Sequence, residues 1–259
     1  MKPIKVLETN ILHASDVLYW LDGSSGETLE KMTRIPETLT LQLTTRPRDL
    51  QLVNGRGKTA LLRRPTNEII DGIASDADKQ MPVTPTYPVA GVVSDPSGRF
   101  IPRRFSINAG NGAGHALAVY PSPLGTRLGP TGGLVGTLRY AASNTPVPWA
   151  MLTLIVDTTL SSSYTFRCQA TAQGDFIMPL RGLPPLPEGI DHYSAELGIQ
   201  ALLTASGDVP VDPADLVAMS LGQLETPDAF SDPISFDLVP NEIRIIRSSN
   251  RDHLAVQPL

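Results

Sequence analysis

Residues 192–203 (HYSAELGIQALL) carry the longest alternation of apolar and polar residues in the chain. Such an alternation places every second side chain on one face of an extended strand. The apolar face consists of Tyr193, Ala195, Leu197, Ile199 and Ala201. A face of this length needs a second layer to cover it, so the stretch predicts a strand in a sheet that packs against another sheet.

The same alternation recurs through the second half of the chain. Leu152, Leu154 and Val156 share one face of an expected strand, and Phe166 and Cys168 share a face of the next. The predicted strands are residues 134–140, 147–157, 164–172, 175–181, 192–203, 234–238 and 242–246. One helix is predicted over residues 212–219 (DPADLVAM), with Asp212 as its N-cap and Pro213 at its first position.

The first half shows weaker signals of the same kind. Leu39, Leu41 and Leu43 alternate with polar residues, and the turn formers at 54–57 (NGRG) predict a hairpin. A second hairpin is predicted around residues 94–99 (SDPSGR), where proline presets φ and glycine accepts a left-handed conformation. The predicted strands are residues 16–22, 39–44, 59–62, 87–93, 100–107 and 115–120, and residues 65–88 are expected to form an irregular connection with one helical turn near 67–73.

Many strands separated by turns predict an all-β fold of two antiparallel β-sandwich domains in tandem, of immunoglobulin or transthyretin type. The 24 prolines and 21 glycines of this 259-residue chain agree with such frequent turns. Residues 121–133 show no apolar period and favour a connection. We therefore expect one domain over 1–124, a linker over 125–133, a second domain over 134–248, and a C-terminal arm over 249–259.

Charge and composition limit the classes of partner and compartment. The chain has 21 basic and 26 acidic residues and a net charge of -5, which disfavours nucleic-acid binding. No apolar run approaches the roughly 20 residues that span a bilayer, so no membrane partner is expected. A single cysteine excludes an internal disulfide, and residues 1–10 (MKPIKVLETN) lack the apolar stretch of a signal peptide. These features predict synthesis in the cytoplasm.

The motifs that carry catalytic or metal chemistry are incomplete. Residues 52–59 (LVNGRGKT) end like a phosphate-binding loop, but Leu52 stands where the first glycine is needed and Pro65 interrupts any helix. The four histidines are dispersed, and the acidic run around Asp71, Asp76 and Asp78 lacks the glycine and distal glutamate of a calcium loop. Cys168 lies in a predicted strand as inert core filling. We expect no catalytic residue, no cofactor and no metal.

Two groups of residues are candidates for contacts with partner proteins. Arg99, Arg103 and Arg104, together with Arg63 and Arg64, could form a basic patch for an acidic partner or for carboxylates of a neighbouring subunit. Solvated strand edges are the favoured alternative, because isolated surface charges usually contribute little. Residues 247–259 (RSSNRDHLAVQPL) are too polar to form a core strand alone, so this segment is expected to lie on another subunit. Its contact candidates are Arg247, Arg251, His253 and Leu259.

Residues 133–181 resemble a carboxypeptidase regulatory-like domain, a seven-stranded, transthyretin-like β-sandwich. The resemblance rests on Gly133-x-x-Gly136, on residues 144–150 (NTPVPWA), and on the strand and turn from Phe166 to Leu180. Residues 171–174 (TAQG) depart from the acidic D-x-x-G of the family, and residues 93–100 (VSDPSGRF) echo that turn in the first half. The resemblance implies a non-catalytic docking module and transfers no active-site residue.

Such modules occur in the baseplates and fibres of phage tails and contractile injection particles. The resemblance therefore favours a structural subunit of a phage tail or tailocin-like particle, a homo-oligomer or hetero-complex that docks its neighbours through sandwich edges, loops and terminal arms. A carbohydrate or cell-surface binding module is the alternative, and it requires Trp20 and Trp149 to be exposed as a platform. An enzyme with an unrecognised site is a third hypothesis.

Overall fold

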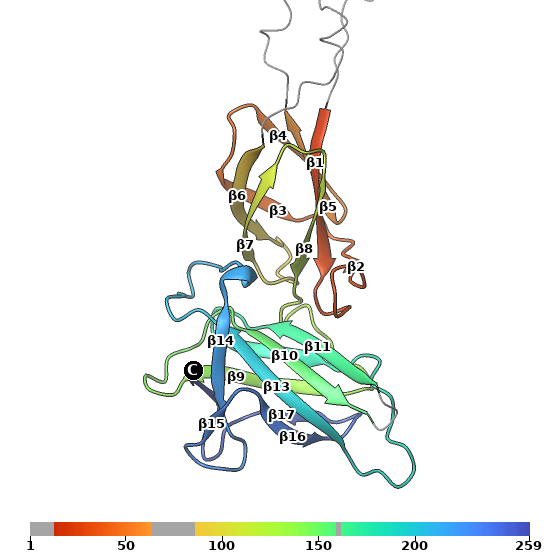
Figure 1. Cartoon of the computed structure of the whole chain (residues 1–259), viewed down its shortest axis with the longest axis vertical. Coiled ribbons are helices and arrows are strands. Elements are labelled where there is room, and N and C mark those ends of the chain that lie inside the picture. Colours follow the sequence, from red (N-terminus) through yellow and green to blue (C-terminus); the bar gives the residue numbers. More distant parts are fainter. Residues whose placement is uncertain (1–12, 64–85, 159–161) are drawn as a thin grey trace, which may run out of the picture.

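The structure is a computed structural model that describes residues 13–63, 86–158 and 162–259. In these residues the fold is all-β, with several antiparallel sheets and a single turn of 3-10 helix. Figure 1 shows strands β1 to β8 stacked on strands β9 to β18 along the long axis, and we call these groups the N-terminal and C-terminal halves. The predicted all-β class is confirmed. The domain boundaries stay a prediction.

The N-terminal half packs two sheets around one apolar cluster. Within this cluster the rings of Trp20 and Phe105 meet edge to face at 6.0 Å. One sheet contains β2 (Thr33–Arg34), β1 (His13–Asp22), β5 (Lys58–Arg63) and β4 (Leu50–Gly55), with β8 (Gly114–Val119) parallel to β1. The other contains β3 (Thr40–Thr45), β6 (Tyr87–Ser94) and β7 (Arg103–Ala109). Both predicted hairpins, β4 with β5 and β6 with β7, are confirmed.

A buried carboxylate fixes the loop between β7 and β8. Asp16 is 1% exposed, and its carboxylate accepts hydrogen bonds from the backbone N–H groups of Gly110 (2.6 Å) and Ala113 (2.7 Å). The Nε2 atom of His115 lies 3.2 Å from the same carboxylate. Because a buried N–H without a partner is costly, Asp16 stabilises a glycine-rich loop that contributes few apolar contacts of its own.

Replacing Asp16 by alanine removes this acceptor and leaves two backbone donors unpaired. We expect Asp16→Ala to lower the free energy of unfolding by about 3 kcal/mol, measured by urea denaturation. Asp191→Ala is the matched control, because the Asp191 side chain is exposed and its backbone has no positive φ. Equal stability of the two variants would contradict the role assigned to Asp16.

The C-terminal half is organised by β9 (Gly133–Tyr140), which takes part in both of its layers. The first part of β9 pairs with β12 (Asp175–Pro179) and β17 (Ile243–Ile245). Its last residues pair with β18 (Leu254–Pro258). The second layer continues through β14 (Val217–Gly222), β13 (Tyr193–Ala201), β10 (Met151–Asp157) and β11 (Ser163–Gln169), with β15 (Phe230–Ser231) on β14 and β16 (Ile234–Leu238) on β13.

The predicted apolar row of β13 forms the centre of this core. Tyr193, Ala195, Leu197, Ile199 and Ala201 are all buried, as the alternation required. They belong to one core cluster with inward residues of other strands in both layers, which include Leu152, Leu154, Phe166, Phe176 and Leu254. The strand pattern of this half therefore follows directly from the period-two placement of apolar residues.

The predicted helix over residues 212–219 is wrong beyond its first turn. Asp212 does cap a 3-10 turn, Pro213–Asp215, and its carboxylate accepts a hydrogen bond from the backbone N–H of Ala214. Leu216 then adopts an extended conformation, and Val217 begins β14. Pairing of β14 with both β13 and β18 outweighs the helical preference of this short segment.

Two turns are stabilised in the same way, by a side-chain oxygen that accepts hydrogen bonds from backbone N–H groups. In residues 95–98 the Asp95 carboxylate accepts hydrogen bonds from the N–H groups of Ser97, Arg99 and Phe100. Partial burial raises the pKa of Asp95, but these hydrogen bonds outweigh it and leave the pKa below its usual value. In residues 171–174 the Thr171 hydroxyl accepts the N–H groups of Gln173 and Asp175. A glycine with positive φ ends each turn.

The predicted C-terminal arm is also wrong in part, because residues 254–258 form a strand of their own chain. Strand β18 lies between β14 and β9, and Leu254, Ala255 and Val256 are fully buried. The polar residues before it fold into a turn, where the Ser248 hydroxyl accepts the N–H of Ala255 and donates to the carbonyl of Gly222. Three apolar residues are enough for a core strand when both of its edges are paired.

Leucines at the two ends of this segment provide a matched test. Leu254 is 0% exposed and Leu259 is 76% exposed. We expect Leu254→Ala to reduce the free energy of unfolding by about 3 kcal/mol through the cavity that it creates, and Leu259→Ala to change it by less than about 0.5 kcal/mol. Urea denaturation followed by tryptophan fluorescence measures both. Similar values for the two variants would contradict the place of β18 in the core.

Several predictions fall on residues outside the described ranges. These are the irregular connection and helical turn within residues 64–85, the aspartates Asp71, Asp76 and Asp78, Arg64, and the N-terminal residues 1–12.

Candidate functional site

A third apolar cluster lies where the two halves meet. The N-terminal half contributes Ile101, Ala118 and Tyr120. The C-terminal half contributes Trp149, Met151, Val211 and Leu216, and all seven residues are buried. The halves therefore share an apolar junction, to which hydrophobic burial contributes as it does in a core.

Arg103 joins the halves through its guanidinium group. Its Nη2 atom donates to Oδ1 of Asp212 at 2.7 Å, across the junction. Its Nη1 atom donates to the carbonyl of Ala118 at 2.6 Å, and its Nε atom donates to the carbonyl of Arg104 at 3.1 Å. The next backbone N–H, that of Arg104, donates to the carbonyl of Val211 at 3.0 Å. A side chain and the main chain thus connect β7 to the segment before β14.

The ion pair between Arg103 and Asp212 is largely shielded from solvent. The Arg103 side chain is 8% exposed and that of Asp212 is 16% exposed. Burial lowers the pKa of Arg103, while the charges of Asp212 and Tyr120 act to raise it. Arginine stays protonated in proteins, so removing Asp212 would leave a buried charge without its counter-ion.

Two further hydrogen bonds fix the residues around the junction. Arg167 on β11 donates through Nη1 to the carbonyl of Glu27 at 2.8 Å, again from one half to the other. Trp149 has φ of 60° and donates its indole N–H to the carbonyl of Ser206 at 2.8 Å. Trp149 belongs to the apolar cluster of the junction, and the residue is 6% exposed.

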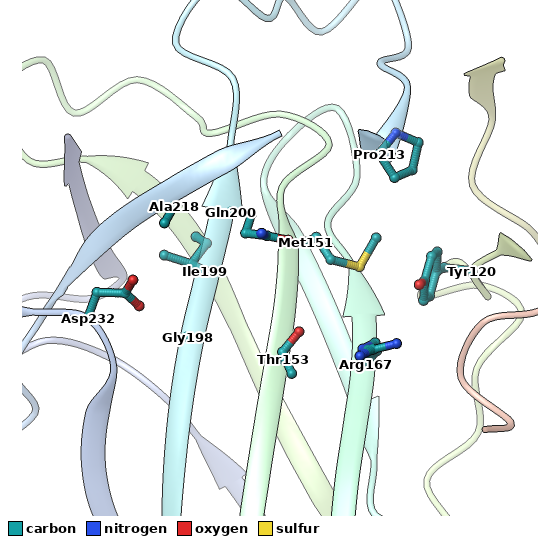
Figure 2. Close-up of a pocket in the computed structure, with 10 residues that line it drawn as sticks. All are labelled: Tyr120, Met151, Thr153, Arg167, Gly198, Ile199, Gln200, Pro213, Ala218 and Asp232. Carbon is teal, nitrogen blue, oxygen red and sulfur yellow. The ribbon is translucent and has the colours of Figure 1, made fainter. Parts of the chain in front are cut away.

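An open pocket of about 450 Å³ lies beside the junction, on the outer face of the C-terminal sheet. Figure 2 shows that its lining residues come from several strands and loops. Thr153 and Arg167 lie on β10 and β11, Tyr120 belongs to the N-terminal half, and Asp232 lies between β15 and β16. In this view the carboxylate of Asp232 lies to the left of Thr153, and the side chain of Arg167 lies to its right (Figure 2).

The electrostatic character of the pocket is mixed. Burial raises the pKa of the Tyr120 hydroxyl, although the charges of Arg167 and Arg103 act to lower it. Partial desolvation raises the pKa of Asp232. One cation and one carboxylate, with the hydroxyl of Thr153 and the amide of Gln200 between them, suit a polar ligand with charges of both signs.

The predicted contact residues are dispersed in the structure rather than collected into one patch. The prediction is wrong for Arg103, which is buried and bound inside its own chain. Arg99 is half-exposed and pairs with Glu37 at 2.8 Å, and Arg104 is exposed. Arg247 and Leu259 are exposed, Arg251 lies 3.5 Å from Asp228, and His253 is buried with its Nδ1 atom 2.7 Å from Asp252.

Other sequence expectations concern single residues. Cys168 is buried, and burial raises the pKa of its thiol far above the usual range, as expected of core filling. Trp20 and Trp149 are 0% and 6% exposed, so they form no stacking platform for a sugar.

Among the described residues, no group of three or more His, Cys, Asp or Glu side chains could hold a metal ion. No helix in the described ranges is long and apolar enough to cross a membrane.

Sequence reasoning missed the residues that build the pocket. Arg167 and Thr153 occupy outward positions of predicted strands, so the alternation alone placed them on the exposed face. Asp212 was expected only as a helix cap, and its pairing with Arg103 spans 109 positions of the chain. No local signal reports such a contact.

The sequence was compared with protein-family models and with curated proteins. No protein-family model matches the sequence, and no curated protein is similar enough to count as a relative.

The Arg103–Asp212 pair can be tested by a double-mutant cycle. We expect Arg103→Met or Asp212→Asn alone to reduce the free energy of unfolding by about 3 kcal/mol, and the double variant to cost less than the sum of the two. Arg104→Ala is the control, because its exposed side chain makes no contact across the junction in the described structure and its backbone N–H is retained. Additive effects in urea denaturation would contradict a direct coupling.

Proposed function

We propose that the chain is a non-catalytic structural subunit that docks neighbouring proteins in a larger assembly. The observation that carries this proposal is the junction, where a buried ion pair, a main-chain hydrogen bond and an apolar cluster hold the two halves together. A subunit that holds its neighbours in fixed relative positions needs a rigid connection between its own two halves. A hinged enzyme, in contrast, needs an interface that can open.

The outer strands of the fold supply surfaces for docking. Strands β3, β11 and β12 each pair with one neighbour in the described sheets. The other edge of such a strand can accept an additional strand from a partner, which is a common mode of protein association. Strand β17 also exposes two apolar side chains that a partner can cover, Ile243 and Ile245.

The particle that we propose is a phage tail or a contractile injection particle of the tailocin type. The support is the resemblance of residues 133–181 to carboxypeptidase regulatory-like modules, which serve such particles as docking units. The turns at Asp95 and Thr171, alike in their hydrogen bonds and in their final glycines, agree with related modules in the two halves. On this proposal the protein would be found in a virion or injection particle, as a homo-oligomer or hetero-complex.

The test is purification of the affinity-tagged full chain from its host, with the mass of every complex measured by light scattering and its chains identified by mass spectrometry. We expect a complex of fixed stoichiometry that contains tail-tube, sheath or spike chains. A monomer that associates with none of these chains and is absent from purified particles would overturn the proposal. An untagged strain purified in parallel controls for capture by the resin.

A further inference from the structure

The floor of the pocket is a straight row of residues across the strands. Thr153 on β10 is the register partner of Arg167 on β11 and also of Gly198 on β13. All three residues line the pocket, so this row faces away from the core. Neighbouring strands lie about 4.8 Å apart, which places Gly198 roughly 10 Å from Arg167 along the row.

Gly198 keeps this floor open. It has no side chain in the middle of β13, and a Cβ atom there would meet only Oδ1 of Asp232, at 3.4 Å. No positive φ is recorded at Gly198, so the backbone itself does not require glycine. The missing side chain therefore leaves a groove that runs from Arg167, over Thr153 and Gly198, to Asp232.

The two ends of the groove carry charges without an opposite partner in the described structure. Arg167 uses one N–H for the carbonyl of Glu27, and no carboxylate within the described ranges forms a salt bridge with it. Asp232 is exposed and likewise forms no salt bridge with a described cation. The other N–H groups of the Arg167 fork and both oxygens of Asp232 can therefore bind an incoming ligand.

We infer that this groove binds an extended segment of a partner polypeptide, with an acidic side chain at Arg167 and a basic side chain at Asp232. The Asp232 carboxylate lies over Gly198, whose backbone is roughly 10 Å from that of Arg167. In an extended segment, residues four positions apart lie on one face and about 13 Å from each other, so their side chains can converge on both charges. A small zwitterion places its two charges too close together to reach both ends. This inference rests on the proposed function, because it names the chemistry of a docked neighbour.

Synthetic peptides can test this charge pattern on the full chain. The probe is acetyl-Asp-Gly-Ser-Gly-Lys-amide, titrated into isotope-labelled protein and followed by amide chemical shifts. Its controls are acetyl-Asn-Gly-Ser-Gly-Gln-amide and acetyl-Asp-Gly-Ser-Gly-Asp-amide. We expect the mixed-charge peptide to bind about fivefold more tightly than either control, with shifts centred on Thr153 and Gly198. Equal binding of all three, or shifts elsewhere on the surface, would overturn the inference.

A change of charge at the exposed end provides a second test that does not threaten folding. Asp232→Lys gives the groove two positive ends, so it should reverse the preference toward the Asp-Gly-Ser-Gly-Asp peptide. Asp191→Lys is the matched control, because Asp191 is also exposed but lies outside the groove. An unchanged preference in Asp232→Lys, or the same reversal in Asp191→Lys, would contradict the assignment.

The outcomes separate this inference from the proposed function. If the peptides fail and the Asp232→Lys chain still enters particles, the groove assignment is wrong and the structural role stands. If the peptide preferences hold and the chain enters no particle, the groove assignment stands and the proposed function is wrong. Gly198→Phe, which fills the floor, should abolish peptide binding while the protein keeps its β-sheet circular dichroism.

Discussion

The ion pair between Arg103 and Asp212 is the contact on which the arrangement of the molecule depends. Both groups are largely removed from water, and such a pair is tolerated only when geometry and hydrogen bonds are nearly complete. Arg103 meets this condition because its other N–H groups reach the carbonyls of Ala118 and Arg104. The pair therefore fixes how the halves meet, while the surrounding apolar cluster supplies most of the buried area.

The pocket is a consequence of that junction. Tyr120 reaches it from the N-terminal half, and Arg167, held by the carbonyl of Glu27, reaches it from the C-terminal sheet. Rotation of one half against the other would separate these two residues. A groove with walls from both halves thus has a defined shape only while the halves stay locked, which links the stability of the junction to any role of the pocket in docking.

Two wrong predictions have the same physical cause. Residues 217–219 were expected in a helix, and residues 254–256 in an arm on another subunit, yet both segments are strands of one sheet. Each is short and has weak local preferences, so pairing with neighbours decides its structure. Strand β18 fills the space between β14 and β9, and those neighbours are far from it in sequence. Local sequence patterns do not show that a position between two distant strands is open for a third strand to pair.

Local sequence patterns were sufficient to predict the strands of the core. The alternation in residues 193–201, and in β10 and β11, requires a half-buried extended chain whatever the neighbours are, because only a period of two puts all of these apolar side chains on one face. The turns at 54–57 and 95–98 were equally local, since they depend on asparagine, aspartate, proline and glycine at adjacent positions. The folded structure was needed to show which strands are neighbours, that Arg103 is buried, and that Arg167, Gly198 and Asp232 share one groove. Those features depend on contacts between residues far apart in the chain, and such contacts are selected by the packing of the whole fold.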